Sequence, residues 1–405
     1  MRILFLTPQL PYPPRQGTQL RNYQIIRMAA GAHQVDLLSF IRPGDGTAIV
    51  DVCRKVETVP APHRGRLFRV RSMFTSTKPD LARRLASRDF EVALCSLLKS
   101  NHYDIVQIEG LEMAIYISIA LAEAPDTTTV IFDDHNVEHI LQLRAARVDA
   151  GHFYSWPKAI YSVVQWAKLK RYERWACNSA GAVLAVSDAD AEALRKIGVE
   201  TPVAVVPNCI DVAWYKRPSE ATSDPDTLLF TGSLDYRPNI DAVRWFVSAI
   251  FPRILARRPQ TKFLIVGRSP SASVLRLAHR HPAIRVVGDV EDVRPFLFRG
   301  TVFVVPIRMA GGSRLKILEA MAAGLPVVST TIGAEGLDLS RDADVLLADS
   351  PRAFADTIIR LLEDEDLRQQ LGASGRKTVE EGYDWRHVAP RLLAVYDTAG
   401  ADATG

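Results

Sequence analysis

Short apolar runs alternate with longer helical patterns along almost the whole chain. Each run is hydrophobic at consecutive positions, which is typical of strands buried on both faces of a parallel sheet. The segments between the runs are long enough for crossover helices, so the pattern predicts α/β domains with helices on both faces of each sheet. The runs are Ile3–Thr7, Val35–Phe40, Asp104–Ile108, Val130–Asp133, Ala182–Val186, Val203–Pro207, Leu228–Gly232, Phe263–Gly267, Arg285–Val287, Val302–Pro306, Val327–Ser329 and Val345–Leu347.

The alternation is interrupted once, between Cys209 and Asp226. The second half of this stretch, from Arg217, is polar, contains two prolines and has no apolar periodicity, which is typical of a connector. We therefore predict two doubly wound Rossmann-like domains that face each other across a cleft. Ligands of open α/β sheets bind at the carboxyl ends of the strands, so loops at those ends should line the cleft.

The composition agrees with an ordinary globular protein, because 47% of the 405 residues are hydrophobic and 24% are charged. The longest nearly uncharged apolar stretch, Met113–Ala122, is far shorter than the roughly 20 residues of a spanning helix. The N-terminal residues run straight into a strand-like segment and lack the features of a signal peptide. No C-x-x-C pair is present, which favours a reduced compartment, so we expect a cytoplasmic protein. The four cysteines are Cys53, Cys95, Cys177 and Cys209.

Charge is distributed unevenly, although the net charge is only +4. Residues 1–90 carry 15 Lys and Arg against 6 Asp and Glu, whereas residues 338–384 carry 6 against 12. Basic and apolar residues are interleaved over 64–88 and again over 156–171. Such stretches suit either an anionic membrane surface or solvated helix faces. No nucleic-acid-binding module is present, so we expect no nucleic-acid partner.

The stretch from Pro306 to Ser329 carries the clearest chemical signal. A strand ends at its start, Gly311-Gly312 forms a loop, and Ser313 is a suitable N-cap for a helix over Arg314–Ala323. The free N–H groups and the dipole of such a helix start favour a bound anion. No G-x-G-x-x-G or Walker A sequence is present, which argues against a dinucleotide enzyme and a P-loop NTPase.

The charged residues of this helix support the same interpretation. Arg314 and Lys316 lie in its first turn, where cations oppose the helix dipole, and a bound phosphate or diphosphate would explain them. Glu319 lies close to the helix face of Ser313, where its carboxylate could accept hydrogen bonds from a ribose. The alternative is a solvated helix with its cations exposed to water.

With these residues in view, the stretch resembles the nucleotide-sugar signature of family 4 glycosyltransferases, which are retaining enzymes of the GT-B fold. The segment Phe230–Asn239 resembles the subgroup of sugar transferases found with exopolysaccharide export systems. Further landmarks follow in the family's order: Pro11–Gly17, Val186-Ser187, Val206–Asp211 and Tyr383–Trp385.

The resemblance implies an acceptor-side domain over 1–205 and a nucleotide-sugar donor domain over 206–384, with a C-terminal helix over 385–400 that crosses back. It implies transfer of a sugar from a nucleotide-diphosphate sugar to a glycan or a polyprenyl-linked acceptor. We expect no required metal or other cofactor. It also implies peripheral association with the inner face of the cell membrane. The donor-binding residues would be Gly17, Gly232, Arg237, Gly311, Gly312, Ser313, Leu315 and Glu319, with Arg314 and Lys316 in catalysis.

The chain departs from the family pattern at two places. The family usually has a glutamate where this chain has Gly311, and that glutamate contacts the donor sugar. The family also often has G-R-L-x-x-x-K-G after the first strand of the second domain, and this chain lacks that arginine and lysine. Arg237, Arg314 and Lys316 are the available substitutes for holding the diphosphate.

A histidine follows a strand of the first domain. The resemblance implies that His135 contacts the donor sugar near the reacting carbon, with Asp134 and Glu138 to orient it and Arg21 on the acceptor side. The alternative is an N-capping Asp pair next to a surface histidine. The sequence from His135 to His139 also fits the H-x-x-E-H pattern of zinc peptidases, if His135 lies inside a helix.

A third possibility for the function of the whole protein is a non-catalytic sugar-nucleotide-binding partner of another enzyme.

Overall fold

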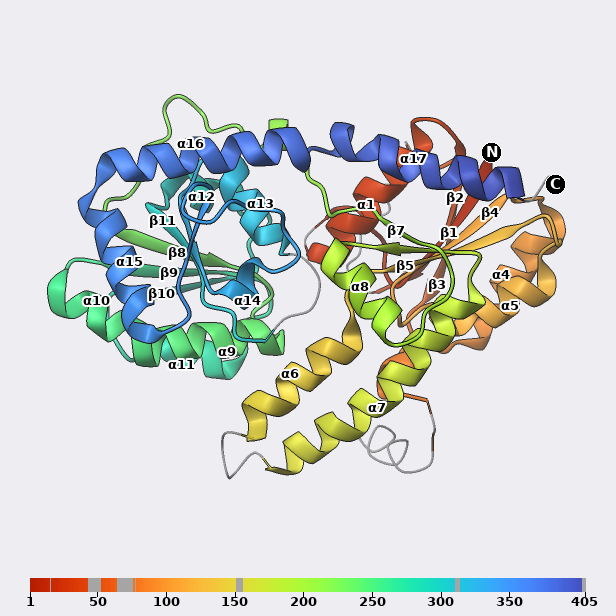
Figure 1. Ribbon diagram of the computed structural model, residues 1–405, viewed down its shortest axis with the longest axis horizontal. Coiled ribbons are helices and arrows are strands. Elements are labelled where there is room, and N and C mark those ends of the chain that lie inside the picture. The colour runs from red at the N-terminus through yellow and green to blue at the C-terminus, as the bar shows by residue number, and fades with distance from the viewer. Residues whose placement is uncertain are drawn as a thin grey trace. The chain divides into compact units, whose positions relative to one another are not determined.

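The computed structural model describes residues 1–14, 16–42, 52–63, 76, 78–150, 156–309 and 314–402. The chain divides into two compact units, which are shown in Figure 1. Unit 1 contains Met1–Asn208 and Val388–Gly405, and unit 2 contains Cys209–His387.

Unit 1 is built on a parallel sheet with the strand order β3-β2-β1-β4-β5-β6-β7 in the described residues. The strands next to its centre are buried along almost their whole length, because helices cover both faces. The strands are β1 (Arg2–Thr7), β2 (Gln34–Ile41), β3 (Lys55–Pro60), β4 (Ile105–Glu109), β5 (Thr129–Asp134), β6 (Ala182–Ala185) and β7 (Val203–Val205).

Aromatic packing fills one side of the sheet in unit 1. The ring of Phe90 lies 4.4 Å from that of Phe40 and 4.5 Å from that of Tyr116, measured between centroids. Such ring pairs add to the stabilisation from apolar burial. The helices are α1 (Gly17–Ala30), α3 (Asp80–Arg83), α4 (Arg88–Ser100), α5 (Ile117–Glu123), α6 (Glu138–Ala150), α7 (Trp156–Ser179), α8 (Asp188–Lys196) and α17 (Trp385–Asp402).

Unit 2 has a second parallel sheet with the order β10-β9-β8-β11-β12-β13. Its strands are β8 (Thr227–Thr231), β9 (Lys262–Gly267), β10 (Ile284–Gly288), β11 (Val302–Val305), β12 (Val327–Ser329) and β13 (Val345–Leu347). Its helices are α9 (Arg237–Trp245), α10 (Phe251–Arg257), α11 (Ala272–Ala278), α12 (Arg294–Arg299), α13 (Leu315–Ala322), α14 (Thr331–Ala334), α15 (Pro351–Glu363) and α16 (Glu365–Gly382), with a π turn over Phe246–Ile250.

The structure confirms the predicted fold class of two doubly wound parallel sheets. Every apolar run identified in the sequence forms a strand, with ends that shift by at most a few residues. Strand β3, at one edge of the sheet, was missed because it mixes polar with apolar residues and so carries no continuous apolar run. No helix in the described part of the chain combines the length and the apolar composition needed to cross a bilayer.

The strand orders indicate, by a general rule, at which strand ends each unit would bind a ligand. In unit 1 the order reverses between β1 and β4, and in unit 2 it reverses between β8 and β11. Ligands of doubly wound sheets bind at the carboxyl ends of the strands on either side of such a reversal. The residues that follow β1 and β4, and those that follow β8 and β11, are therefore the first places to look for chemistry.

Candidate functional site

In unit 2, the turn after β8 makes an unusually close approach to a helix. Gly232 has a φ of +149°, and a Cβ at this position would lie 2.8 Å from the Lys316 Nζ and 2.8 Å from the Asn239 Nδ2. Any side chain here would displace one of these two groups. Glycine is favoured here because L side chains rarely adopt a φ of +149°.

The Lys316 amine is held at this point by two contacts. Its Nζ donates to the Asn239 Oδ1 at 2.8 Å and lies 4.2 Å from the centroid of the Phe230 ring. The side chain is half-buried, and burial together with the charge of Arg314 lowers the pKa of Lys316 to about 7. A bound polyanion would favour the charged form of this amine, so binding would draw a proton onto it.

Glu319 lies on the same helix and is paired with a tyrosine. The Tyr215 hydroxyl, from the 3₁₀ turn over Val212–Tyr215, donates to the Glu319 Oε1 at 2.7 Å. Burial raises the pKa of Glu319, although the Tyr215 hydrogen bond and the Lys316 charge act in the opposite direction. The second carboxylate oxygen is available in this arrangement to accept a hydrogen bond from a ligand hydroxyl.

The structure describes some of the other predicted donor-side residues and not others. Gly311, Gly312 and Ser313 lie outside the described residues. Arg314 occupies the N-cap position of α13, and the structure begins this helix at the buried Leu315, one residue later than the sequence suggested. Arg237 is the exposed first residue of α9.

The strand end that leads into residues 310–313 is anchored to α9. The Arg308 guanidinium donates two hydrogen bonds to Asp241, of 3.0 and 2.7 Å. The Arg308 Cζ lies 5.2 Å from the centroid of the Trp245 ring. Such a bidentate pair fixes both position and orientation. Helix α9 therefore contacts the chain on both sides of residues 310–313, at Arg308 and at Lys316.

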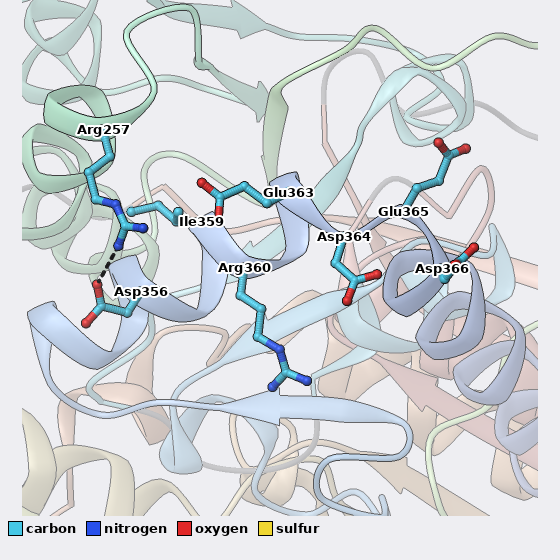
Figure 2. Close-up of a pocket in the computed structure, with 8 residues that line it drawn as sticks. All are labelled: Arg257, Asp356, Ile359, Arg360, Glu363, Asp364, Glu365 and Asp366. Carbon is cyan, nitrogen blue, oxygen red and sulfur yellow. Dashed lines mark ion pairs between the residues drawn. The ribbon is translucent and has the colours of Figure 1, made fainter.

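Unit 2 also contains a hollow between α10, α15 and the start of α16, and Figure 2 shows the side chains that line it. Five of these are carboxylates and two are arginines, and Arg257 lies 3.6 Å from Asp356. The hollow shares no residue with the turn after β8 or with α13. A predominantly acidic lining repels phosphate, so this hollow does not suit a nucleotide-diphosphate donor.

In unit 1, a buried arginine joins α1 to the end of β5. Arg21 makes hydrogen bonds of 2.9 and 2.6 Å to the two carboxylate oxygens of Asp133. Its remaining nitrogen donates to the Val206 carbonyl and to the Asn208 Oδ1, both at 3.1 Å. Burial alone would raise the pKa of Asp133, but Arg21 and His135 outweigh it and hold that pKa well below its usual range.

His135 belongs to the same buried network. Its Nε2 lies 2.9 Å from the Glu109 Oε2 and 3.6 Å from the Asp133 Oδ2. Burial would lower the pKa of His135, but these two carboxylates raise it to about 9, so the ring is an imidazolium at neutral pH. Burial and Asp133 raise the pKa of Glu109 to about 7. Gly110 follows Glu109 with a φ of +83°, a left-handed conformation that favours glycine.

Among the described residues, Glu109, Asp133 and His135 are close enough together to be considered as metal ligands. The carboxylate oxygens of this group already accept hydrogen bonds. Arg21 donates to both oxygens of Asp133, and Gln107 donates to the Glu109 Oε1 at 2.7 Å. A cation would have to compete with the arginine for Asp133. The group is therefore better described as a hydrogen-bonded ion-pair network.

The zinc-peptidase pattern does not form the required geometry. Helix α6 begins at Glu138, so His135 lies before the helix and not inside it. The Nδ1 of His139 bonds to Glu173 on α7, whereas His135 bonds to Glu109 on β4. The prerequisite for this alternative, two histidines on one helical face, is therefore absent at these positions.

The two residues proposed to orient His135 lie as follows. Asp134 is 2% exposed, and burial together with Glu173 raises its pKa well above the usual value. The Glu138 N–H donates to the Glu173 Oε1 at 2.7 Å, at the first residue of α6. Gly17 is the first residue of α1, on which Arg21 lies one turn later.

Sequence reasoning missed three residues that contact the predicted ones. These are Glu109 next to His135, Tyr215 next to Glu319, and Asn239 next to Lys316. Each belongs to a different element from its partner. The signal that could have found them was position, since Glu109 ends an apolar strand and Asn239 lies in the first turn of the helix that follows β8.

Comparison with known proteins places both units in one enzyme class. Residues 16–214 match the family described as Glycosyltransferase Family 4, and residues 225–364 match Glycosyl transferases group 1. The chain is a glycosyltransferase of the family 4 type. The solved structures agree on the fold: sucrose-phosphate synthase from Thermosynechococcus elongatus has a TM-score of 0.75 at 18% identity and covers 99% of this chain and 100% of its own.

Further similar proteins help to place this glycosyltransferase. HepE of Anabaena, solved with UDP and glucose, has a TM-score of 0.71 at 16% identity and covers 98% of this chain and 100% of its own. The phosphatidyl-myo-inositol mannosyltransferase of Mycobacterium tuberculosis is 32% identical over 52% of this chain and 57% of that protein. An uncharacterized 44.6 kDa protein in the cps region of Klebsiella pneumoniae is 22% identical over 96% of this chain and 97% of its own length. The match to the mannosyltransferase spans about half the length of that protein.

Proposed function

We propose that this glycosyltransferase moves a sugar, with retention, from a nucleotide-diphosphate sugar to a glycan or a polyprenyl-linked acceptor in the synthesis of an exopolysaccharide or cell-surface polysaccharide. Unit 2 binds the donor and unit 1 receives the acceptor. The observation that carries the proposal is the group at the β8–β11 reversal, where Lys316 and Arg314 lie at the start of α13 and Glu319 lies one turn further on.

The cations of this group suit a leaving diphosphate. As the bond from the anomeric carbon to the phosphate oxygen breaks, negative charge grows on that oxygen, and Arg314 and Lys316 stabilise it. The acceptor oxygen bonds to the anomeric carbon on the same face, and its proton passes to the leaving phosphate. Fixed cations contribute most when they are in place before the reaction, as the Asn239 and Phe230 contacts of Lys316 provide.

Glu319 and His135 supply recognition in this scheme. The Glu319 carboxylate accepts hydrogen bonds from the ribose, with Tyr215 holding one of its oxygens. His135, charged and supported by Glu109 and Asp133, donates to a hydroxyl of the donor sugar near the reacting carbon. Backbone groups of Gly17, Gly232, Gly311, Gly312 and Ser313 complete the donor site in the proposal.

A two-stage experiment tests this function. A panel of nucleotide sugars is first screened by thermal shift, because a ligand at 100 times its Kd adds about 2.7 kcal/mol of stability. The donor that stabilises the protein is then incubated without acceptor and with lipid-linked glycan acceptors, and NMR of the product gives the anomeric configuration. Product with the donor's configuration is expected, and an inverted product would contradict retention.

The same assay tests the alternative of a non-catalytic binding partner, which the glycine at position 311 favours because the family usually has a glutamate there. Binding of a nucleotide sugar with no transfer and no slow hydrolysis would support that alternative. Hydrolysis of the donor in the absence of acceptor would exclude it.

A further inference from the structure

We infer that Asn239 is a positioning residue, which directs the Lys316 ammonium toward the donor diphosphate without neutralising it; this rests on the proposed function. Asn239 lies in the first turn of α9 and is only 6% exposed. Its partner, Lys316, is 77 positions away in the sequence. No part of the family pattern described above assigns a role to this asparagine.

The Asn239 amide connects two parts of the site at once. Its Oδ1 accepts from the Lys316 Nζ at 2.8 Å, and its Nδ2 donates to the Ser233 carbonyl at 2.9 Å. The same side chain thus fixes the lysine on α13 and the backbone turn that follows β8. The amide cannot rotate by 180° without placing an NH₂ group against the ammonium and an oxygen against the carbonyl.

Packing around the turn after β8 restricts the positions that the Lys316 side chain can adopt. A Cβ on Gly267, at the end of β9, would lie 1.7 Å from the Gly232 carbonyl oxygen, so the turn is held between β9 and α13. The centroid of the Phe230 ring lies 4.2 Å from the Lys316 Nζ. Asn239 is the polar side chain that faces the amine among these contacts.

The chemistry of the amide explains why an aspartate would not serve. A carboxylate 2.8 Å from the ammonium would form an ion pair and compete with the diphosphate for the same charge. It would also lose the NH₂ donor to Ser233. A neutral acceptor orients the ammonium and leaves its charge for the ligand, and it keeps the pKa of Lys316 low enough for protonation to respond to an arriving anion.

The first experiment measures Lys316 directly, without any ligand. The protein is labelled with ¹³C-lysine, the Lys316 resonance is assigned with Lys316→Arg, and its titration is followed by NMR in the wild type and in Asn239→Asp. We expect a midpoint near pH 7 in the wild type. In Asn239→Asp we expect it to be higher by about one pH unit or more. An unchanged midpoint would overturn the positioning role.

The second experiment measures binding of UDP, GDP and inorganic pyrophosphate by calorimetry, together with uridine and guanosine. Asn239→Asp and Asn239→Ala should each weaken the diphosphates at least fivefold and the bare nucleosides less than twofold. In the wild type, diphosphate affinity should fall as the pH rises from 6 to 8.5, and in Asn239→Asp this dependence should flatten. Equal losses for diphosphate and nucleoside would indicate a structural role only and overturn the inference.

Asn178→Asp is the matched control. This asparagine also bridges two backbone groups, with its Nδ2 on the Gly198 carbonyl at 3.0 Å and its Oδ1 on the Glu200 N–H at 2.9 Å, and it belongs to unit 1. The Asn178→Asp substitution introduces the same negative charge, and it should change neither the Lys316 titration nor the binding of diphosphates. If the wild type binds none of the diphosphates, that result contradicts the proposed function. The NMR titration separately decides whether Asn239 controls the protonation of Lys316.

Discussion

The Glu319 carboxylate on α13, with its partner Tyr215, should contribute to nucleotide binding. Glu319→Ala should weaken binding of the nucleotide by about 1.5–3 kcal/mol, because hydrogen bonds to a charged group are lost. Tyr215→Phe keeps the carboxylate and removes only its tyrosine partner, so its loss should be smaller. Calorimetry with UDP and GDP measures both variants. An affinity of Glu319→Ala equal to that of the wild type would exclude the ribose role.

The two cations should separate binding from turnover. Arg314→Ala and Lys316→Ala should lower kcat/KM for sugar transfer by a larger factor than they weaken binding of the bare nucleoside. The reason is that charge grows on the leaving diphosphate only in the transition state, where these residues act most strongly. Steady-state kinetics with the identified donor, compared with nucleoside binding, gives the two factors. Equal factors would place both residues away from the diphosphate.

The length of α13 depends on a backbone conformation at its end. Gly324 has φ +75°, and nothing lies within 4 Å of a Cβ at this position, so substitution meets backbone strain alone. Gly324→Ala should therefore lower the free energy of unfolding by about 1–2 kcal/mol. Urea-induced unfolding, followed by circular dichroism, would show this as a lower midpoint.

Gly382→Ala provides the comparison for that variant. Gly382 is the last residue of α16 and also has nothing within 4 Å of a Cβ, but its φ is not positive. Alanine there should leave the urea midpoint unchanged or raise it, because alanine favours helix by about 1 kcal/mol over glycine. If both variants shifted the midpoint equally, the left-handed conformation would not be what makes glycine necessary at position 324.

The protein as a whole should associate with anionic membranes if its acceptor is lipid-linked. The predicted surface is the basic stretch over 64–88, of which 64–75 and 77 lie outside the described residues. Each cation near an anionic surface contributes about 1 kcal/mol, and salt screens this attraction. We expect the protein to pellet with anionic liposomes at low salt, to pellet little with neutral ones, and to be released by salt.

A triple variant tests that surface. Arg66→Glu, Arg69→Glu and Arg71→Glu together should abolish pelleting and leave nucleotide binding intact. Failure of the wild type to bind anionic liposomes at low salt would favour an acceptor that is free in solution.

Much of the architecture follows from local sequence. Continuous apolar runs locate the strands, because a strand buried on both faces needs apolar side chains at successive positions. The helix after residue 313 and its stop at Gly324 follow from residue types within a few positions of each other. Lys316 and Glu319 lie on one short helix with Arg314 at its N-cap, and their spacing in the sequence likewise indicates that they are close together.

Contacts between elements required the tertiary structure. Lys316 meets Asn239, Glu319 meets Tyr215, and His135 meets Glu109, across separations of 77, 104 and 26 residues. Periodicity reports which face of an element is buried, but it does not report which other element covers that face. The sequence alone therefore determined the two sheets, the family resemblance and the positions of Arg314, Lys316 and Glu319. Only the fold, by bringing together elements that are distant in the sequence, decided which side chains contact Lys316, Glu319 and His135.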